Sequence, residues 1–262
     1  MVERLTFGGN FIDWYWIFIL IALIVGVPIF YLRIRDNKKI GLSIVEIAII
    51  SNIFLFVGYL SAIFFTQFTR VVFTHLGLIV SNQDYTLSST KLSVFEWDGA
   101  LFFFVILEIA LFFSLRRQRN RILELFDQLV IALCIMYAIG KMGCFFSGHL
   151  GCRGVITALP WGVFYSKGNY PSMYPLHPVQ IYDSLFSCAL FVFLKTRDKE
   201  KKHSGTTTVW YLTLFSFFNL FMEGLRDTPK EIGVYALGQY LYGTIIALAL
   251  FFLYFIKKQK PC

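Results

Sequence analysis

The sequence predicts an all-α integral membrane protein with about seven transmembrane helices. Of its 262 residues, 57% are hydrophobic and only 15% are charged, whereas charged residues make up about 25% of a typical soluble domain. The apolar residues gather in runs close to the roughly 20 residues that a helix needs to cross a bilayer. We therefore expect one integral membrane domain that spans residues 1–262.

Seven apolar runs can be drawn along the chain, and the third and fifth are the shortest. In order, they are Ile12–Leu32, Ser43–Phe65, Gly99–Leu115, Leu125–Met142, Gln180–Leu194, Thr206–Leu225 and Ala236–Ile256. No cleavable signal peptide is expected, because the first run continues far past the apolar core of such a peptide.

The orientation follows from basic tracts, which come after every second apolar run. Their residues are Arg33, Arg35, Lys38 and Lys39; Arg116, Arg117, Arg119 and Arg121; Lys195, Arg197, Lys199, Lys201 and Lys202; and Lys257, Lys258 and Lys260. Because basic loops stay in the cytoplasm, the N-terminus is predicted outside and the C-terminus in the cytoplasm. This placement beside apolar runs also argues against a nucleic acid partner, despite the net charge of +8.

The segment Gly140–Asp183 is the one long polar interruption and lies on the predicted outer face. It holds two of the four histidines, four of the seven prolines and seven glycines, a mixture unsuited to helices that face lipid. Irregular polar backbone is tolerated at membrane depth only where protein or a water-filled cavity covers it. We therefore interpret this segment as the lining of a site.

Polar groups near the predicted outer leaflet are the candidate functional residues, because such groups are costly inside a membrane. They are Tyr15, Lys141, His149, Arg153, His177, Gln180, Tyr182, Asp183, Glu223, Arg226 and Asp227.

Structural roles are open for several of these residues. Tyr15 can belong to an interfacial aromatic belt, and His177 can simply cap the helix that follows it. Asp183 and Glu223 can pair with basic neighbours, and Arg226 can be an interfacial arginine that extends to lipid phosphates.

Three further readings apply to the cysteines of the interruption. Cys144, His149 and Cys152, with His177 more distant, are residue types that bind zinc, but the C-x4-H-x2-C spacing is not a common one. On an oxidising outer face Cys144 and Cys152 can instead form a disulfide. The third reading, two unpaired small residues, is the one we adopt, and we expect no metal and no cofactor.

Several motifs carry a family resemblance. Residues 140–153 read G-K-M-G-C-F-F-S-G-H-L-G-C-R and resemble the signature of bacterial prolipoprotein diacylglyceryl transferases, roughly G-R-x-G-N-F-x-N-G-E-x-x-G-R. Residues 159–163 (L-P-W-G-V) and 177–183 (H-P-V-Q-I-Y-D) are similar to the family's L-P-W-G-V and H-P-S-Q-L-Y-E. Residues 223–227, 237–239 and 14–15 resemble its E-F-x-R, M-G-Q and W-Y. The resemblance spans the chain, and the family's seven spans and outer N-terminus agree with the count above.

The resemblance implies an enzyme of lipoprotein biosynthesis in the bacterial cytoplasmic (inner) membrane. The family moves the diacylglyceryl group of phosphatidylglycerol to the lipobox cysteine of a prolipoprotein signal peptide, and glycerol-1-phosphate leaves. That chemistry needs cations at the departing phosphate, a group that turns the thiol into a thiolate and a cavity open to lipid that positions both substrates.

The resemblance also implies roles for individual residues. Lys141 and Arg226 match two family arginines and would bind the phosphate, and Tyr15 matches an essential family tyrosine. The residues expected to take part in catalysis are Tyr15, Lys141, His149 and Arg226. The residues expected to bind substrate are Lys141, Cys144, Arg153, His177, Gln180, Tyr182 and Arg226.

The chain departs from the family pattern at several positions. Lys141 replaces arginine, so a point charge stands where the family has a bidentate fork. Cys144 replaces asparagine, His149 replaces glutamate and Cys152 replaces glycine. Trp97 stands where the family has a catalytic histidine, and His149 is an alternative source of an imidazole.

The departures leave three further hypotheses beside the transferase. The chain can be a divergent paralogue with an altered lipid or acceptor, or a non-catalytic membrane protein that binds lipid or lipoprotein. A transporter is disfavoured, because the polar groups gather at the outer side rather than at the midplane between repeats.

Overall fold

The computed structural model of the chain describes residues 5–7, 10–12, 14–37, 40, 119–148, 152–165, 172–227 and 237–258. Its long elements are all helices: α1 (Trp14–Arg35), α4 (Arg119–Ser147), α5 (Val179–Glu200), α6 (Thr206–Leu225) and α7 (Leu237–Lys257). A hairpin of two short strands, β1 (Leu5–Phe7) and β2 (Asn10–Ile12), precedes α1. The helical fold class is confirmed for these residues, while the predicted runs Ser43–Phe65 and Gly99–Leu115 lie outside them.

Within the described part, α1, α4, α5 and α7 are long and apolar enough to cross a membrane. The chain is thus a multi-pass membrane protein by the length and composition of these helices. The helix α6 fills the predicted run Thr206–Leu225 without any shift of its bounds.

The expected bounds of α4 and α5 were wrong. The helix α4 continues five residues past Met142 to Ser147, so the first eight residues of the presumed irregular segment are helical. It ends where Gly148 adopts a φ of 64°, a left-handed conformation that closes helices and suits glycine. The helix α5 runs on from Leu194 to Glu200, because its charged last turns are anchored by ion pairs rather than by lipid.

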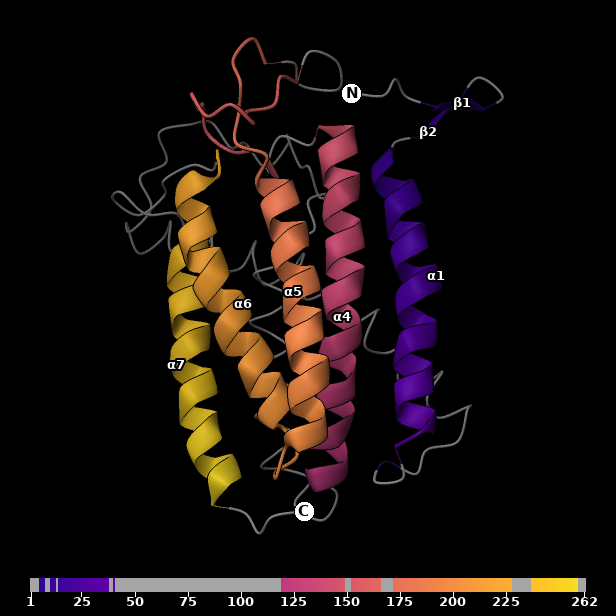
Figure 1. Ribbon diagram of the computed structural model, residues 1–262, viewed down its shortest axis with the longest axis vertical. Coiled ribbons are helices and arrows are strands. Elements are labelled where there is room, and N and C mark those ends of the chain that lie inside the picture. Colours follow the sequence, from indigo (N-terminus) through magenta and orange to yellow (C-terminus); the bar gives the residue numbers. More distant parts are fainter. Residues whose placement is uncertain are drawn as a thin grey trace, which may run out of the picture.

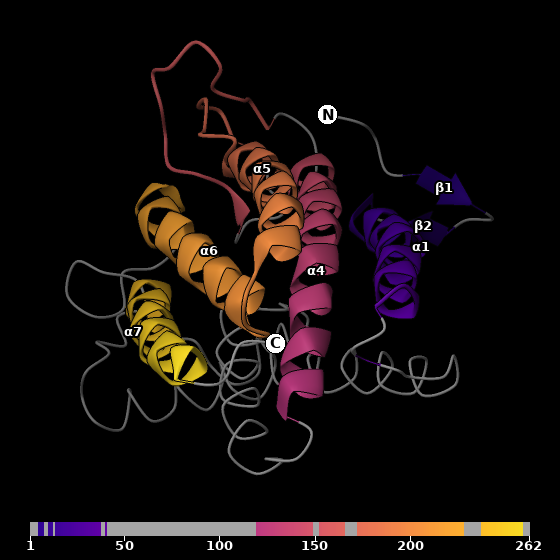
Figure 2. The ribbon, with the colours of Figure 1, turned by 60° about the horizontal axis from the view of Figure 1, so that its bottom comes forward.

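The helices form a bundle in which consecutive members from α4 to α7 alternate in direction (Figure 1). The helix α1 packs on α4, α4 packs on α5 and α6, and α6 packs on α7. In a tilted view, α1 and α7 lie on opposite sides of the bundle (Figure 2). One end therefore gathers the start of α1, the end of α4, the start of α5 and the end of α6. We call it the site end, and we call the opposite end the basic end.

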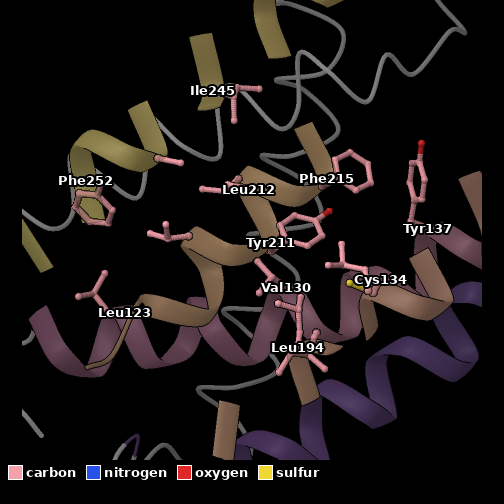
Figure 3. Packing of buried hydrophobic residues seen from close by; sticks show 14 of the residues in the cluster. Leu123, Val130, Cys134, Tyr137, Leu194, Tyr211, Leu212, Phe215, Ile245 and Phe252 are labelled. Carbon is pink, nitrogen blue, oxygen red and sulfur yellow. The ribbon is translucent and has the colours of Figure 1, made fainter. Parts of the chain in front are cut away.

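A core of buried apolar side chains joins α4, α5, α6 and α7 (Figure 3). The aromatic ring of Phe215 belongs to this core, and its centroid lies 4.9 Å from that of Tyr137 and 5.3 Å from that of Tyr211. Interlocked aromatic rings of this kind hold neighbouring helices at fixed rotations. The hydroxyl-bearing ring of Tyr137 stands on the side of this core that faces the site end, four residues before Lys141 on the same helix.

Candidate functional site

Two basic side chains meet at one buried carboxylate at the site end. Lys141 Nζ of α4 lies 2.8 Å from Asp183 Oδ2 of α5. Arg226, directly after α6, brings its Nη2 atom to 3.0 Å from Asp183 Oδ1 and 2.8 Å from Oδ2. Three helices thus converge at Asp183, whose side chain is 0% exposed. The structure thus brings together Lys141 and Arg226, the two cations that the family resemblance assigns to one phosphate.

Arg226 has further partners on its own helix. Its Nη2 atom donates to Asn219 Oδ1 at 2.9 Å, and its Nη1 atom donates to Glu223 Oε1. Asn219, Glu223 and Arg226 are spaced four and three residues apart, so they lie on one face of the α6 helix and its continuation. No described residue bonds Arg226 Nε, so this N–H group remains as a donor.

The burial of Arg226 corrects one reading from the sequence. An interfacial arginine that reaches toward lipid phosphates would be exposed at its tip, yet Arg226 is only 6% exposed. The alternative reading of Asp183 and Glu223 as ion-pair partners holds, because both carboxylates contact Arg226. Two carboxylates therefore balance Lys141 and Arg226 in the structure.

The register between α4 and α5 is fixed by two serines next to the ion pairs. Ser184 Oγ donates to the Ala138 carbonyl oxygen at 3.0 Å, and Ser187 Oγ donates to that of Cys134 at 2.8 Å. Both hydroxyls lie on the face of α5 that also carries Asp183. The serines thereby hold Asp183 beside Lys141.

Extended backbone covers the site end above α5 (Figure 1). Gly154 pairs with Arg226 in an antiparallel bridge, and Leu176 forms bridges with Ile156 and Val163. Gly154 packs closely against the next layer, because a Cβ there would lie 2.4 Å from the Cβ of His177. This cover ties the end of the 140–153 signature to the H-P-x-Q-x-Y motif and to the end of α6.

The H-P-x-Q-x-Y residues contact aromatic side chains of this cover. Gln180 Oε1 accepts a hydrogen bond from Tyr165 Oη at 3.1 Å. Trp161 Nε1 donates to Tyr182 Oη at 2.7 Å, and His177 Nδ1 lies 3.5 Å from the same hydroxyl. These contacts show how the motif fastens the cover, and its proposed role in substrate binding stays a prediction.

Arg153, the last residue of the signature, is a third buried cation of the site end. It is 4% exposed, and its guanidinium carbon lies 5.3 Å from the centre of the Tyr165 ring. Burial raises the pKa of Tyr165 to about 12, so its hydroxyl stays protonated and donates to Gln180.

Cys144 and Cys152 lie together beside the ion pairs. Both are free thiols, and their side chains are joined by a hydrogen bond. The disulfide considered from the sequence is therefore not formed. His149, which completes the considered zinc set, lies outside the described residues, as does Trp97.

Tyr15 lies half-buried on the first turn of α1, where this helix approaches α4. A Cβ on Gly143 would lie 2.6 Å from Phe18 Cβ and 3.4 Å from the Tyr15 carbonyl oxygen. Glycine at 143 thus permits the close approach of α1, two residues from Lys141. The catalytic role of Tyr15 stays a prediction.

Asn219 belongs to the site but was not among the sequence candidates. A signal was available, because its spacing of four residues from Glu223 and seven from Arg226 places all three on one helical face. An amide in an apolar run is also rare unless it has a polar partner.

The basic end holds a second buried polar cluster. Lys201 Nζ lies 2.7 Å from Glu124 Oε1, 2.8 Å from Asp127 Oδ2 and 2.8 Å from Asp198 Oδ1. These three carboxylates are close enough to hold a metal ion, but the ammonium group of Lys201 lies among them. Burial opposes this charge, yet the carboxylates outweigh it and raise the pKa of Lys201 above its ordinary value. The cluster accordingly has a structural role, because it links α4 to the end of α5; we call it the joint at Asp127.

Comparisons with known proteins agree with the motifs. Residues 4–256 match the family described as prolipoprotein diacylglyceryl transferase. The chain is 27% identical to the phosphatidylglycerol–prolipoprotein diacylglyceryl transferase of Clostridioides difficile, over 97% of this chain and 95% of that protein. The same identity relates it to the protein of that name from Clostridium botulinum, over 97% and 96%. The protein named phosphatidylglycerol–prolipoprotein diacylglyceryl transferase 2 from Clostridium perfringens is 32% identical over 56% of this chain and 57% of its own length.

Proposed function

Because this chain belongs to the prolipoprotein diacylglyceryl transferase family, we propose that it transfers the diacylglyceryl group of phosphatidylglycerol to the thiol of a prolipoprotein cysteine. A carbon–sulfur bond forms at the glyceryl carbon, and the bond from that carbon to the phosphate oxygen breaks. The phosphate oxygen keeps the bonding electrons and leaves as glycerol-1-phosphate. The thiol proton goes to a base.

The observation that carries this proposal is the meeting of Lys141 and Arg226 at Asp183. Negative charge develops on the departing phosphate, and prearranged cations in a dry site stabilise it most strongly. Asp183 keeps both cations in one place before substrate arrives. Arg226 Nε and the further donors of Lys141 are then the groups offered to the phosphate.

The two carboxylates of this site oppose the binding of a phosphate. Asp183 and Glu223 already balance the two cations, so a phosphate must compete with them for donors. Arg153 is a further buried cation at this end, and its carbonyl oxygen accepts a hydrogen bond from the amide of Asp227, directly after Arg226. We assign Arg153 to substrate binding for this reason.

We propose His149 as the base that accepts the thiol proton. It takes the family's glutamate position in the signature, five residues after Cys144, and an imidazole changes protonation near neutral pH. Lys141 and Arg153 flank it in the sequence, and a positive charge near an imidazole favours the neutral form, which can accept a proton. Tyr15 is proposed to complete the catalytic set from α1.

The proposed setting is the bacterial cytoplasmic membrane, with the site end on the outer side. The basic tracts support this orientation, since Arg35, Lys201 and Lys257 all follow or end helices at the basic end. A lipobox peptide secreted across the membrane would then reach the site end. The proposed partners are phosphatidylglycerol and the prolipoprotein signal peptide.

The test is a transfer assay with purified protein, phosphatidylglycerol and a lipobox peptide, read as thioether product by mass spectrometry. Product formation that is lost on changing the peptide cysteine to serine supports the proposal. The alternative is a transferase with an altered lipid or acceptor, which is favoured by Lys141 and Cys144 at family signature positions. A panel of other anionic lipids and acceptors tests this alternative, because product would then form with one of them and not with phosphatidylglycerol and the lipobox peptide. Absence of product with every lipid and acceptor would leave the non-catalytic lipid-binding alternative.

A further inference from the structure

A groove lined by both cationic and apolar side chains opens at the basic end between α5, α6 and α7. Its volume is about 290 Å³. Arg197 from α5, Lys202 from the α5–α6 turn and Lys257 from α7 line it, together with the apolar Trp210 of α6 and Leu253 of α7. Residues from three elements thus contribute to a single concave surface.

The charge of this groove is positive. Arg197, Lys202 and Lys257 have exposed side chains, and Glu200 is the one carboxylate among the lining residues. Glu200 Oε2 lies 3.4 Å from Arg197 Nη1 with both side chains mostly exposed, an arrangement that contributes little pairing energy. Lys201 also lines the groove, but the three carboxylates described above already balance its charge. Three available cations therefore face one carboxylate.

The apolar part of the lining lies deeper along the helices. Trp210 is 43% exposed and sits in the second turn of α6, with its ring centre 5.9 Å from that of Phe193. Tryptophan is enriched where headgroups meet acyl chains. Leu253 of α7 lies one helical turn before Lys257, so cationic and apolar lining residues are displaced along the helix axis.

We propose that this groove binds the phosphate headgroup of an anionic phospholipid, with the acyl chains of that lipid beside Trp210 and Leu253. Basic pockets between helix ends on the cytoplasmic side of membranes take anionic headgroups. A free phosphate ion would use the cations alone, whereas a lipid also accounts for the apolar side of the groove.

This lipid site is separate from the proposed transfer site. Within α5 (Val179–Glu200), the groove residue Arg197 lies 14 residues after Asp183, a rise of about 21 Å at 1.5 Å per residue. The lipid in the groove would belong to the other leaflet and would not be a substrate.

Quenching of Trp210 fluorescence tests the proposal in full-length protein. The protein is reconstituted in phosphatidylcholine nanodiscs that contain a minority of brominated phosphatidylglycerol or, in parallel, brominated phosphatidylcholine. The Trp210 signal is the difference between the wild type and Trp210→Phe. We expect the anionic brominated lipid to quench this signal several-fold more strongly than the zwitterionic one.

Two matched triple variants separate the groove from the general surface charge. Arg197→Gln/Lys202→Gln/Lys257→Gln removes the groove cations, and each basic contact with an anionic lipid is worth about fivefold in affinity. Lys195→Gln/Lys199→Gln/Lys258→Gln removes equal charge from exposed side chains at the same end that do not line the groove. We expect only the first variant to lose the preference for phosphatidylglycerol.

The outcomes that overturn the proposal are equally definite. Equal quenching of wild-type Trp210 by both lipids excludes an anionic site, and equal loss in both triple variants assigns the effect to surface potential. Abolition of quenching by excess inorganic phosphate would identify an ion site instead of a lipid site. The readout contains no transfer step, so it stands whether or not the chain forms thioether product.

Discussion

Arg226 and Asp183, 43 positions apart in the sequence, form a buried ion pair in which one guanidinium nitrogen contacts both carboxylate oxygens. Neither side chain is more than 7% exposed. Removing such charges from water is costly unless they are well bonded, and here Lys141, Asn219 and Glu223 provide further contacts. The pair therefore fixes the end of α6 against the start of α5.

Replacement of Arg226 by lysine should lower transferase activity about a hundredfold or more, because one lost donor at a developing charge costs about that much. Lysine keeps the charge but cannot hold Asp183 and Glu223 through separate nitrogens while offering a further donor. The measurement is the rate of thioether formation per amount of folded protein in the membrane. Arg35→Lys, an exposed change at the basic end, serves as the control and should leave the rate unaltered. Full activity of Arg226→Lys would remove Arg226 from the phosphate site.

Replacement of Asp183 by asparagine should destabilise the protein by about 3–5 kcal/mol, because it leaves buried cations uncompensated. Thermal unfolding in detergent measures the effect, and Asp36→Asn on the surface provides the control. Lys141→Met combined with Asp183→Asn should restore part of the loss, since the two side chains are in contact and their effects are not additive. If the loss of stability in the double variant equals the sum of the losses in the two single variants, Lys141 and Asp183 do not stabilise each other.

Lys201 and Lys202 form a natural matched pair at the basic end. Lys201→Met should lower the midpoint of thermal unfolding strongly because it removes the one ammonium group that contacts all three carboxylates, whereas Lys202→Met should have little effect. The raised pKa of Lys201 means that its contribution is complete below about pH 10.4, its ordinary pKa. That contribution is lost as the pH rises through the higher folded value. Stability of Lys201→Met should therefore fall less between neutral and strongly alkaline pH than that of the wild type, and an equal fall would contradict this account.

The hydrogen-bonded thiols of Cys144 and Cys152 should be joined by a mild oxidant, which takes up two electrons while two protons leave. Peptide mapping by mass spectrometry should find the 144–152 linkage and should lose it in Cys152→Ser. Cys152 is the more exposed thiol, so an alkylating reagent should label it before Cys144. Failure to detect the linkage in folded protein would show that the two sulfur atoms do not meet.

The orientation predicted from the basic tracts can be measured with reporters. A reporter fused at Cys262 should report the cytoplasm, and one inserted at Lys167 should report the outside. Both positions lie outside the described residues, so this prediction rests on the charge distribution alone. Opposite readings at both positions would invert the protein and move the site end to the cytoplasm.

The helices could be predicted from the sequence because an apolar run of about 20 residues identifies a membrane helix. Their ends could not, since packing and ion pairs decide them. The helix α4 passes through Gly140 and Gly143 because Gly143 lets α1 approach closely. The charged end of α5 stays helical up to the ion pairs of Lys201, which an apolar-run criterion cannot detect.

The candidate site was predicted in part for a similar reason. Motif spacing marked Lys141 and Arg226 as a pair, and the structure brings both to Asp183. Composition could not decide whether Arg226 reaches lipid or is buried, because that depends on Asn219 and Asp183 across a helix interface. The contact between Tyr165 and Gln180 likewise depends on how the cover folds back over α5.

The joint at Asp127 has a consequence for the order in which the chain is built into the membrane. The partners that the structure gives this carboxylate are Lys201, the Gly205 amide and Thr208, and the Gly205 amide lies 78 positions further along the chain. During synthesis from the N-terminus, α4 is therefore complete before any of these partners exists. A nascent α4 must keep Asp127 hydrated at the membrane surface until the α5–α6 turn arrives. The α5–α6 turn then bonds this carboxylate late in biogenesis, and that step joins α4 to α5 and α6.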